Sequence, residues 1–333
     1  MLTDLDETGL WEYRSTYKAP ADFDEFWRRT LEEAAAFPLD VRIERVATDL
    51  RTIDVFDVTF AGYGGHPVHA WLRLPRIPGT RPTSERQLPG VLQFHGYGSG
   101  RGHVLDDLLW ASAGYAHLLM DARGQGGDHA GGDTGDPVGS SGPTHPGFLT
   151  KGLENPEAYY YRRVFVDAVR ALQVLREHVA VDGSRVGIVG ASQGGGIALA
   201  VAGLVPDQVA ALHAQSPFLC DIRRATRITD AAPYREIATF LAAHRTSAAQ
   251  VFETLGYFDG LGFAARAGAP AWFSAGLMDA VCPPSTAFGA YHAYAGPKHI
   301  NLWEYNGHDA GGPEDLAAVL SAFRPLLQEE DQS

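Results

Sequence analysis

Residues 185–196 read Arg-Val-Gly-Ile-Val-Gly-Ala-Ser-Gln-Gly-Gly-Gly, and they carry the clearest structural signal in the chain. A short apolar run typical of a buried strand precedes Ser192, and the apolar residues from Ile197 onward predict a helix. G-x-S-x-G between a strand and a helix is the nucleophile elbow, a strained turn that exposes the serine hydroxyl. The small residues Gly190 and Gly194 let strand and helix pass close together. We therefore expect Ser192 to be a catalytic nucleophile.

Two other uses of the same glycines compete with this interpretation. An ordinary glycine-rich turn remains the alternative, because G-x-S-x-G also arises by chance. A dinucleotide or phosphate loop is disfavoured, since neither the G-x-G-x-x-G nor the G-x-x-x-x-G-K-[ST] spacing is present.

Strands and helices alternate on both sides of the elbow. Apolar runs predict further strands at 90–94, 115–121, 209–214, 271–275 and 299–305. The segment 156–179 predicts a helix with one apolar face, made of Val164, Ala168, Leu172, Leu175 and Val179. This alternation predicts an α/β fold with a mostly parallel sheet and helices on both faces.

Other segments predict additions to this core. Residues 1–40 are expected to form an N-terminal arm with a helix over 22–36. The runs 53–60 and 67–74 predict a hairpin, 77–87 and 124–147 predict loops, and 104–113 predicts a helix. A last helix should start near Pro313 and end at Pro325. Between the strands that end at Ala214 and begin at Ala271, we expect a helical cap over 218–265, within a single domain of residues 1–333.

Composition excludes several classes of partner. The 27 Lys and Arg residues against 40 Asp and Glu give a net charge of −13, which argues against a nucleic-acid backbone and an anionic membrane surface. No stretch is long and apolar enough to predict a transmembrane helix. The two cysteines, Cys220 and Cys282, favour a reducing compartment over a disulfide framework. The first residues lack the pattern of a signal peptide, so we expect a cytoplasmic location.

A serine nucleophile needs a base and an acid that orients the base. In this fold the expected chain order is Ser, Asp or Glu, then His. Asp279 follows the predicted strand 271–275, and His308 follows the predicted strand 299–305. We expect His308 to take the Ser192 proton and Asp279 to fix the imidazole tautomer. The alternative for Asp279 is an acid that caps the following helix, and the alternative for His308 is a polar loop residue. Asp309 is another candidate acid, but it is adjacent to His308 in the sequence and poorly placed to reach its ring.

An oxyanion hole needs two N–H donors near the serine. The backbone N–H of Gln193, directly after the nucleophile, is the first candidate. The second is the backbone N–H of Tyr97, in the His-Gly-Tyr-Gly loop after the predicted strand 90–94. The alternative for this loop is a turn with no catalytic part.

The chain resembles the acetyl xylan esterase and cephalosporin C deacetylase family, which is carbohydrate esterase family 7. The shared segments follow one another in order along nearly the whole chain. They are Pro20-Ala-Asp-Phe-Asp-Glu-Phe-Trp27, Phe94-His-Gly-Tyr97, Asp121-Ala-Arg123-Gly124-Gln125-Gly126, Gly190-Ala-Ser-Gln-Gly194, Gly276-Leu-Met-Asp279, Cys282-Pro-Pro-Ser285 and Gly307-His308.

The resemblance implies an α/β-hydrolase fold and serine esterase chemistry without a metal or other cofactor. It implies removal of acetyl and other short acyl groups by a triad of Ser192, Asp279 and His308, with Tyr97 and Gln193 as oxyanion donors. Arg123 and Gln125 would support the site, with a solvated loop pair as the alternative. A homo-oligomer, hexameric as in the family, is also implied. The chain departs from the family pattern at Asp309, where a Glu usually follows the histidine.

Two other functions stay open at this point. The same triad would serve another serine hydrolase, such as a peptidase or a longer-chain esterase. A non-catalytic binding protein of the same fold is disfavoured, because all three triad candidates are present. A metalloenzyme has little support, since no H-E-x-x-H motif or paired cysteine ligands appear. The natural acetylated substrate, for example a xylo-oligosaccharide or cephalosporin C, is not named by the sequence.

Overall fold

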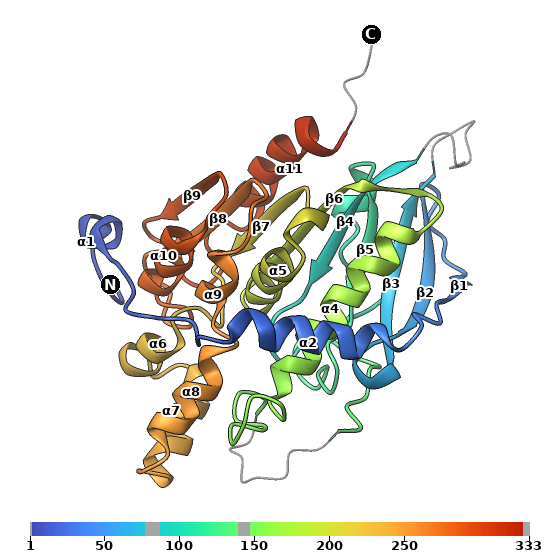
Figure 1. Cartoon of the computed structure of the whole chain (residues 1–333). Coiled ribbons are helices and arrows are strands. Elements are labelled where there is room, and N and C mark those ends of the chain that lie inside the picture. The colour runs from blue at the N-terminus through green and yellow to red at the C-terminus, as the bar shows by residue number, and fades with distance from the viewer. Residues whose placement is uncertain (1, 77–86, 139–146, 329–333) are drawn as a thin grey trace.

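The structure is a computed structural model, and it describes residues 2–76, 87–138 and 147–328. Its described strands form one nine-stranded sheet in the order β1-β2-β3-β5-β4-β6-β7-β8-β9 (Figure 1). The strands are β1 (Arg42–Val46), β2 (Ile53–Ala61), β3 (Pro67–Pro75), β4 (Leu88–Phe94), β5 (Ala116–Met120), β6 (Val181–Ala191), β7 (Ala211–Gln215), β8 (Ala271–Gly276) and β9 (Lys298–Trp303).

The sheet is mostly parallel, as the alternation of strands and helices predicts. Strands β5, β4, β6, β7, β8 and β9 pair in parallel, whereas β1, β2 and β3 add an antiparallel edge. Strands β2 and β3 form the expected hairpin, with Ile53 opposite Pro75 and Ala61 opposite Pro67. Because the parallel strands share one direction, their carboxyl ends meet at one edge, where sites of this fold class lie.

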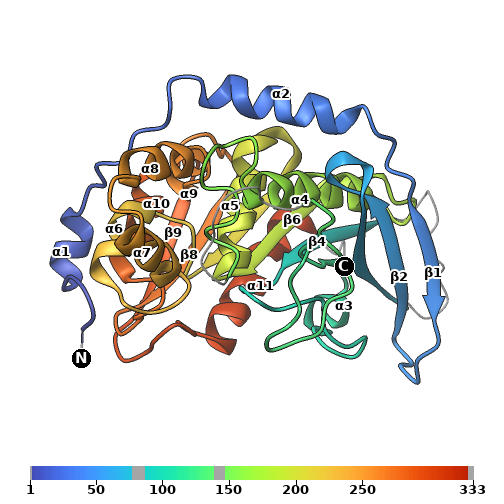
Figure 2. The same cartoon turned by 90° about the horizontal axis from the view of Figure 1, so that it is seen from below.

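Helices cover both faces of the sheet (Figure 2). One apolar cluster joins α4 and α5 to one face, and a second joins α3 and α11 to the other face. This arrangement confirms the α/β-hydrolase fold. The helices are α1 (Glu7–Glu12), α2 (Phe23–Ala35), α3 (Leu109–Ser112), α4 (Tyr160–Glu177), α5 (Gln193–Leu204), α6 (Ile222–Ile228), α7 (Tyr234–Ala243), α8 (Ala248–Gly256), α9 (Gly260–Ala264), α10 (Pro284–Ala293) and α11 (Pro313–Leu327).

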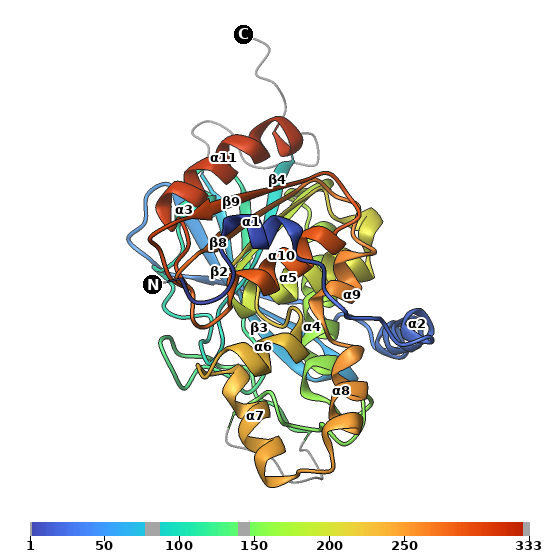
Figure 3. The same ribbon diagram turned by 90° about the vertical axis from the view of Figure 1, so that its left-hand side faces the viewer.

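The segment before β1 and the segment between β7 and β8 pack outside these layers. Helix α2 lies across α4 and α5 as an outer layer (Figure 2). Helices α6, α7, α8 and α9 follow β7, and α7 and α8 stand beyond the sheet (Figure 3). Helix α1 packs against α10, where the Trp11 ring meets the Phe288 ring edge-on at a centroid distance of 5.1 Å. None of the described helices is long and apolar enough to cross a membrane.

Three local predictions are wrong at their ends. The helix expected over 104–113 is only α3 (Leu109–Ser112), because Asp107 has φ 51°, which an α-helix does not accommodate. Val179, expected on the buried face of α4, lies past the end of that helix and is 68% exposed. Helix α11 continues past Pro325 to Leu327, which is fully buried in the cluster with Phe323.

Two of the predicted loops lie partly outside the residues that the structure describes. Most of the loop predicted over 77–87, and part of the loop predicted over 124–147, lie outside the described residues.

Candidate active site

Ser192 occupies a strained turn between β6 and α5. Its backbone has φ 55° and ψ −120°, a region that side-chain-bearing residues rarely adopt. The two flanking glycines are required by close packing. A Cβ atom on Gly190 would come within 2.1 Å of the carbonyl carbon of Gly194, and one on Gly194 would come within 2.1 Å of the carbonyl oxygen of Phe94. The sequence G-x-S-x-G therefore folds here as a nucleophile elbow.

Asp279 and His308 meet at the carboxyl ends of neighbouring strands. Asp279 follows β8 and His308 follows β9, which pair in parallel. The Nδ1 atom of His308 lies 2.8 Å from Oδ2 of Asp279, and the Asp279 side chain is fully buried. The other carboxylate oxygen of Asp279 accepts hydrogen bonds from the N–H groups of Val281 and Cys282, at 2.8 and 2.9 Å. These bonds fix the carboxylate so that Oδ2 faces the imidazole.

The structure brings Ser192 to the same edge but records no hydrogen bond from its hydroxyl to the His308 ring within the described part of the chain. The hydroxyl contacts the thiol of Cys282 instead, and this contact opposes the burial that raises the pKa of that thiol. Catalytic hydrogen bonds are often long before substrate binds, so this geometry is compatible with a triad. Asp309 is exposed, and its backbone carbonyl accepts a hydrogen bond from Gln215 at 2.7 Å.

The two expected oxyanion donors lie in segments that touch each other. Gln193 is the first residue of α5, so its N–H has no partner within the helix. Its side-chain amide donates to the carbonyls of His95 and Gly96, at 3.4 and 3.3 Å, which ties it to the loop that carries Tyr97. A carbonyl oxygen beside Ser192 could therefore approach N–H groups from both segments.

Gln125 connects the Tyr97 loop to Gln193 through hydrogen bonds of its side chain. Its side-chain oxygen accepts from the N–H of Gly98 at 2.8 Å and from the side-chain amide of Gln193 at 3.1 Å. Its side-chain nitrogen donates to the oxygen of the Gln193 amide at 2.8 Å and to the Tyr160 hydroxyl at 3.0 Å. Every hydrogen-bonding position of this buried amide is engaged, so the side chain holds Gln193 and the Tyr97 loop at a fixed separation.

Arg123 is linked to Gln125 through the Tyr160 hydroxyl, and its side chain is fully buried. Its guanidinium makes a two-point ion pair with Asp167 of α4, at 2.6 and 2.7 Å, and both side chains are fully buried. The carbonyl of Arg123 accepts a hydrogen bond from the Tyr160 hydroxyl. The alternative expectation of a solvated loop pair at Arg123 and Gln125 is wrong, because both side chains are buried.

The cap helix α7 contributes a residue that sequence analysis misses. Glu236 accepts a hydrogen bond from the Tyr97 hydroxyl at 2.6 Å and another from the N–H of Leu149 at 3.1 Å. Burial and the neighbouring carboxylate raise the pKa of Tyr97, so its hydroxyl stays a donor. No local pattern marks Glu236, since its partners lie far away in the sequence.

The N-terminal arm also reaches the loop that carries Asp279. The Thr3 hydroxyl donates to the carbonyl of Asp279 at 2.8 Å. Asp4 accepts from the N–H of Ser285 and from the Arg224 guanidinium, each at 2.9 Å, and Arg224 also donates to the Ser285 hydroxyl at 2.6 Å. We call Asp4, Arg224 and Ser285 the arm clamp. Through Ser285 at the start of α10, the arm clamp holds the end of the loop between β8 and α10 in place.

No group of three or more His, Cys, Asp or Glu side chains suited to a metal ion occurs among residues 2–76, 87–138 and 147–328.

Comparisons with known proteins show the family to which the chain belongs. The acetyl xylan esterase (AXE1) family matches residues 1–321. The solved acetyl xylan esterase from Paenibacillus sp. R4 is 35% identical, with a TM-score of 0.90 over 97% of this chain and 100% of its own. Acetyl xylan esterase 1 from Thermoanaerobacterium sp. JW/SL YS485 is 32% identical, with a TM-score of 0.87 over 96% of this chain and 99% of its own.

A longer relative matches over most of the chain. The acetyl esterase Axe7A from Xylanibacter ruminicola is 29% identical over 300 residues, which make up 87% of this chain. The match spans 64% of the length of that relative. With the family match over nearly its whole length, this chain belongs to the acetyl xylan esterase (AXE1) family.

Proposed function

We propose that this protein is a carboxylic ester hydrolase that removes acetyl groups from acetylated carbohydrates through an acyl-enzyme on Ser192. The hydrogen bond between His308 and Asp279, at the same sheet edge as the Ser192 elbow, is the observation that carries the proposal. The family and the names of the two solved esterases support acetyl as the acyl group. Short acetylated xylo-oligosaccharides and cephalosporin C-like esters are the proposed substrates.

The proposed reaction has two halves. The Ser192 hydroxyl attacks the acetyl carbonyl while His308 takes its proton, and the carbonyl electron pair moves onto oxygen. The N–H groups of Gln193 and Tyr97 stabilise this oxyanion. When the oxyanion collapses, the ester C–O bond breaks and the alcohol leaves with the proton from His308. Water then attacks the acetyl-enzyme by the same route, which releases acetate and restores Ser192.

The direct test is the Ser192→Ala variant on 4-nitrophenyl acetate. We expect its kcat to fall by about 10⁴-fold or more, because the residual rate comes from the oxyanion donors and binding alone. Ser184→Ala is the matched control, since Ser184 lies near the start of β6 and its hydroxyl bonds to Asp182. Activity near wild type in Ser192→Ala would remove Ser192 from this role.

A second measurement separates the proposal from its alternatives. A serine-directed phosphonate should add to Ser192, as read by peptide mass, whereas a non-catalytic binding protein would stay unlabelled. A panel of 4-nitrophenyl esters and peptides should then show kcat/KM falling as the acyl chain lengthens beyond acetyl. Faster cleavage of peptides or long-chain esters would instead identify a different serine hydrolase.

Three further properties belong to the same proposal. The cap over 218–265 is proposed to shape the choice of alcohol, and it is supported by the contact of Glu236 with Tyr97. A cytoplasmic location is supported by two free, buried cysteines. Assembly into a hexamer is proposed on the family resemblance alone, and light scattering of the purified protein tests it.

A further inference from the structure

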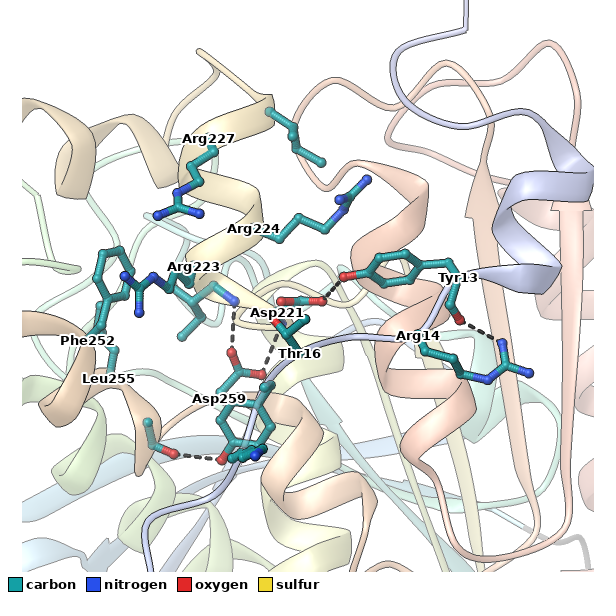
Figure 4. Close-up of a pocket in the computed structure, with 15 residues that line it drawn as sticks. Tyr13, Arg14, Thr16, Asp221, Arg223, Arg224, Arg227, Phe252, Leu255 and Asp259 are labelled. Carbon is teal, nitrogen blue, oxygen red and sulfur yellow. Dashed lines mark hydrogen bonds between the residues drawn. The ribbon is translucent and has the colours of Figure 1, made fainter. Parts of the chain in front are cut away.

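A separate cavity of about 470 Å³ lies between the N-terminal arm, α6 and α8 (Figure 4). Tyr13, Arg14 and residues 16–18 of the arm form one side, α6 forms the second and α8 the third. None of the proposed triad or oxyanion residues lines it. A cavity of this size is within the usual range for small-molecule sites.

The charge of this cavity is opposite to that of the chain. Five cationic side chains line it, namely Arg14, Lys18, Arg223, Arg224 and Arg227, against the two acids Asp221 and Asp259. The whole chain carries a net charge of −13. The cavity therefore carries an excess of positive charge, which favours an anionic ligand.

The two acids in the cavity are already engaged by other groups. Asp221 accepts a hydrogen bond from the Tyr13 hydroxyl at 2.5 Å (Figure 4). Asp259 accepts from the N–H groups of Asp221, Ile222 and Leu261, at 3.0, 2.8 and 3.1 Å. Both carboxyls are buried, and burial raises the pKa of Asp259 to about 7. Neither acid forms an ion pair with a cation of the cavity among the residues that the structure describes.

Two of the five cations have partners of their own. Arg224 belongs to the arm clamp, and the Arg14 guanidinium donates to the carbonyls of Trp11 and Tyr13. Arg223, Arg227 and Lys18 have no ion pair with any residue that the structure describes. All three are exposed at the rim of the cavity.

Arg223 and Arg227 present their charges side by side. They are four residues apart on α6, and Figure 4 shows both on the Phe252 side of that helix, whereas Arg224 points toward Tyr13. The Arg223 guanidinium lies over the Phe252 ring at 5.0 Å. Like charges at this spacing repel each other on a helix, and an anion between them removes that repulsion. Phe252 and Leu255 add an apolar wall beside the two guanidinium groups.

We propose that this cavity binds a small organic anion whose carboxylate or phosphate sits between Arg223 and Arg227 and whose carbon skeleton lies against Phe252 and Leu255. Guanidinium groups match both kinds of anion with paired hydrogen bonds, so the shared chemistry is a planar or tetrahedral oxyanion on an apolar body. Lys18, on the arm side, supplies a third positive charge. The cavity contains none of the proposed triad or oxyanion residues, and the proposal does not rest on the esterase reaction.

Calorimetric titration of the whole chain tests the site without reference to activity. The probes are sodium phenylacetate, phenyl phosphate and inorganic phosphate, with benzyl alcohol as the neutral control. We expect saturable binding of at least one organic anion, weakened about ten-fold or more by Arg223→Gln/Arg227→Gln, because each charged hydrogen bond is worth at least a factor of ten. Binding of phenylacetate alone identifies a carboxylate ligand, and binding of phenyl phosphate alone identifies a phosphate ester.

The matched control is Arg51→Gln/Arg245→Gln, which removes two exposed positive charges outside the cavity. It should bind as wild type does. Thermal unfolding checks the fold of each variant, and Lys18→Gln gives a second, weaker test on a different element. Three results overturn the proposal: no binding by either organic anion, equal binding of benzyl alcohol, or equal loss in the control variant. Binding of inorganic phosphate alone is a case of the first result, because the apolar wall then takes no part.

Discussion

Asp4 and Arg224 are 220 residues apart in the chain, yet their side chains form an ion pair at 2.9 Å beside the loop that carries Asp279. The Asp4 side chain is 4% exposed and also accepts a hydrogen bond from the N–H of Ser285. We expect Asp4→Ala to lower kcat by about ten- to hundred-fold, because a small shift of Asp279 misplaces the imidazole of His308. The KM should change little, since Asp4 does not touch the substrate site.

Steady-state kinetics on 4-nitrophenyl acetate measures this split between kcat and KM. Asp6→Ala is the control, because Asp6 lies in the same segment but only caps α1 through the N–H of Gly9. Asp4→Asn should recover part of the rate, since its amide oxygen still accepts from one donor. An equal loss in Asp6→Ala would mean that the arm acts through general stability and not through Asp279.

Asp279→Asn should remove catalysis while keeping the fold. The Asn oxygen can still accept from the N–H groups of Val281 and Cys282, which now bond to Oδ1 of Asp279. Its NH₂ group would then face Nδ1 of His308 and force the wrong imidazole tautomer. We expect kcat to fall by about 10⁴-fold with an unchanged circular dichroism spectrum. Asp309→Asn should keep wild-type activity, and a large loss there would transfer the role to Asp309.

The sheet and the candidate triad were predictable because their signals are local or follow from strand direction. The run 185–196 contains its own strand, turn and helix, and parallel strands bring Asp279 and His308 to one edge. The helix α4 was predicted from one apolar face, but its polar face is also buried. Arg162 and Arg170 of that face bond to residues of α2 and of the segment after it, which no local pattern could show.

The contacts that surround the proposed site were not predictable for the same reason. Glu236 reaches Tyr97 from the cap, and Thr3 reaches Asp279 from the arm, across 139 and 276 residues of chain. A single sequence reports periodicity along the chain, and it does not report which distant side chains meet. The predicted start of α3 is wrong because a single residue, Asp107, has a positive φ that ends any helix there.

Buried histidines should make the protein less stable in acid. Burial lowers the pKa of His213 from 6.5 to about 4 and also lowers the pKa of His95, whose Nε2 accepts from the N–H of Ala122. Because each folded pKa lies below the unfolded value, the stabilisation is complete above about pH 6.5 and is lost as the pH falls. For His213 alone the loss reaches about 3 kcal/mol near pH 4.

Urea unfolding across this pH range measures the effect. His213→Gln should flatten the fall in unfolding free energy between about pH 6.5 and about pH 4. His129→Gln is the matched control, because the His129 side chain is 75% exposed, and it should leave the slope as in wild type. Equal slopes in wild type and His213→Gln would show that His213 does not control the acid sensitivity.

Arg123→Met should destabilise the protein more than any exposed ion-pair variant. It leaves Asp167 buried, and among the described residues the N–H of Tyr63, at 2.8 Å from Oδ1, is the remaining donor. Breaking a buried ion pair in this way costs about 3–5 kcal/mol, which urea unfolding resolves. The double variant Arg123→Met/Asp167→Leu should recover much of the loss, because no unpaired charge is left.

Arg28→Met, which removes an exposed pair with Glu25, should unfold as wild type does. If Arg123→Met and Arg28→Met unfold alike, the buried pair does not stabilise the fold.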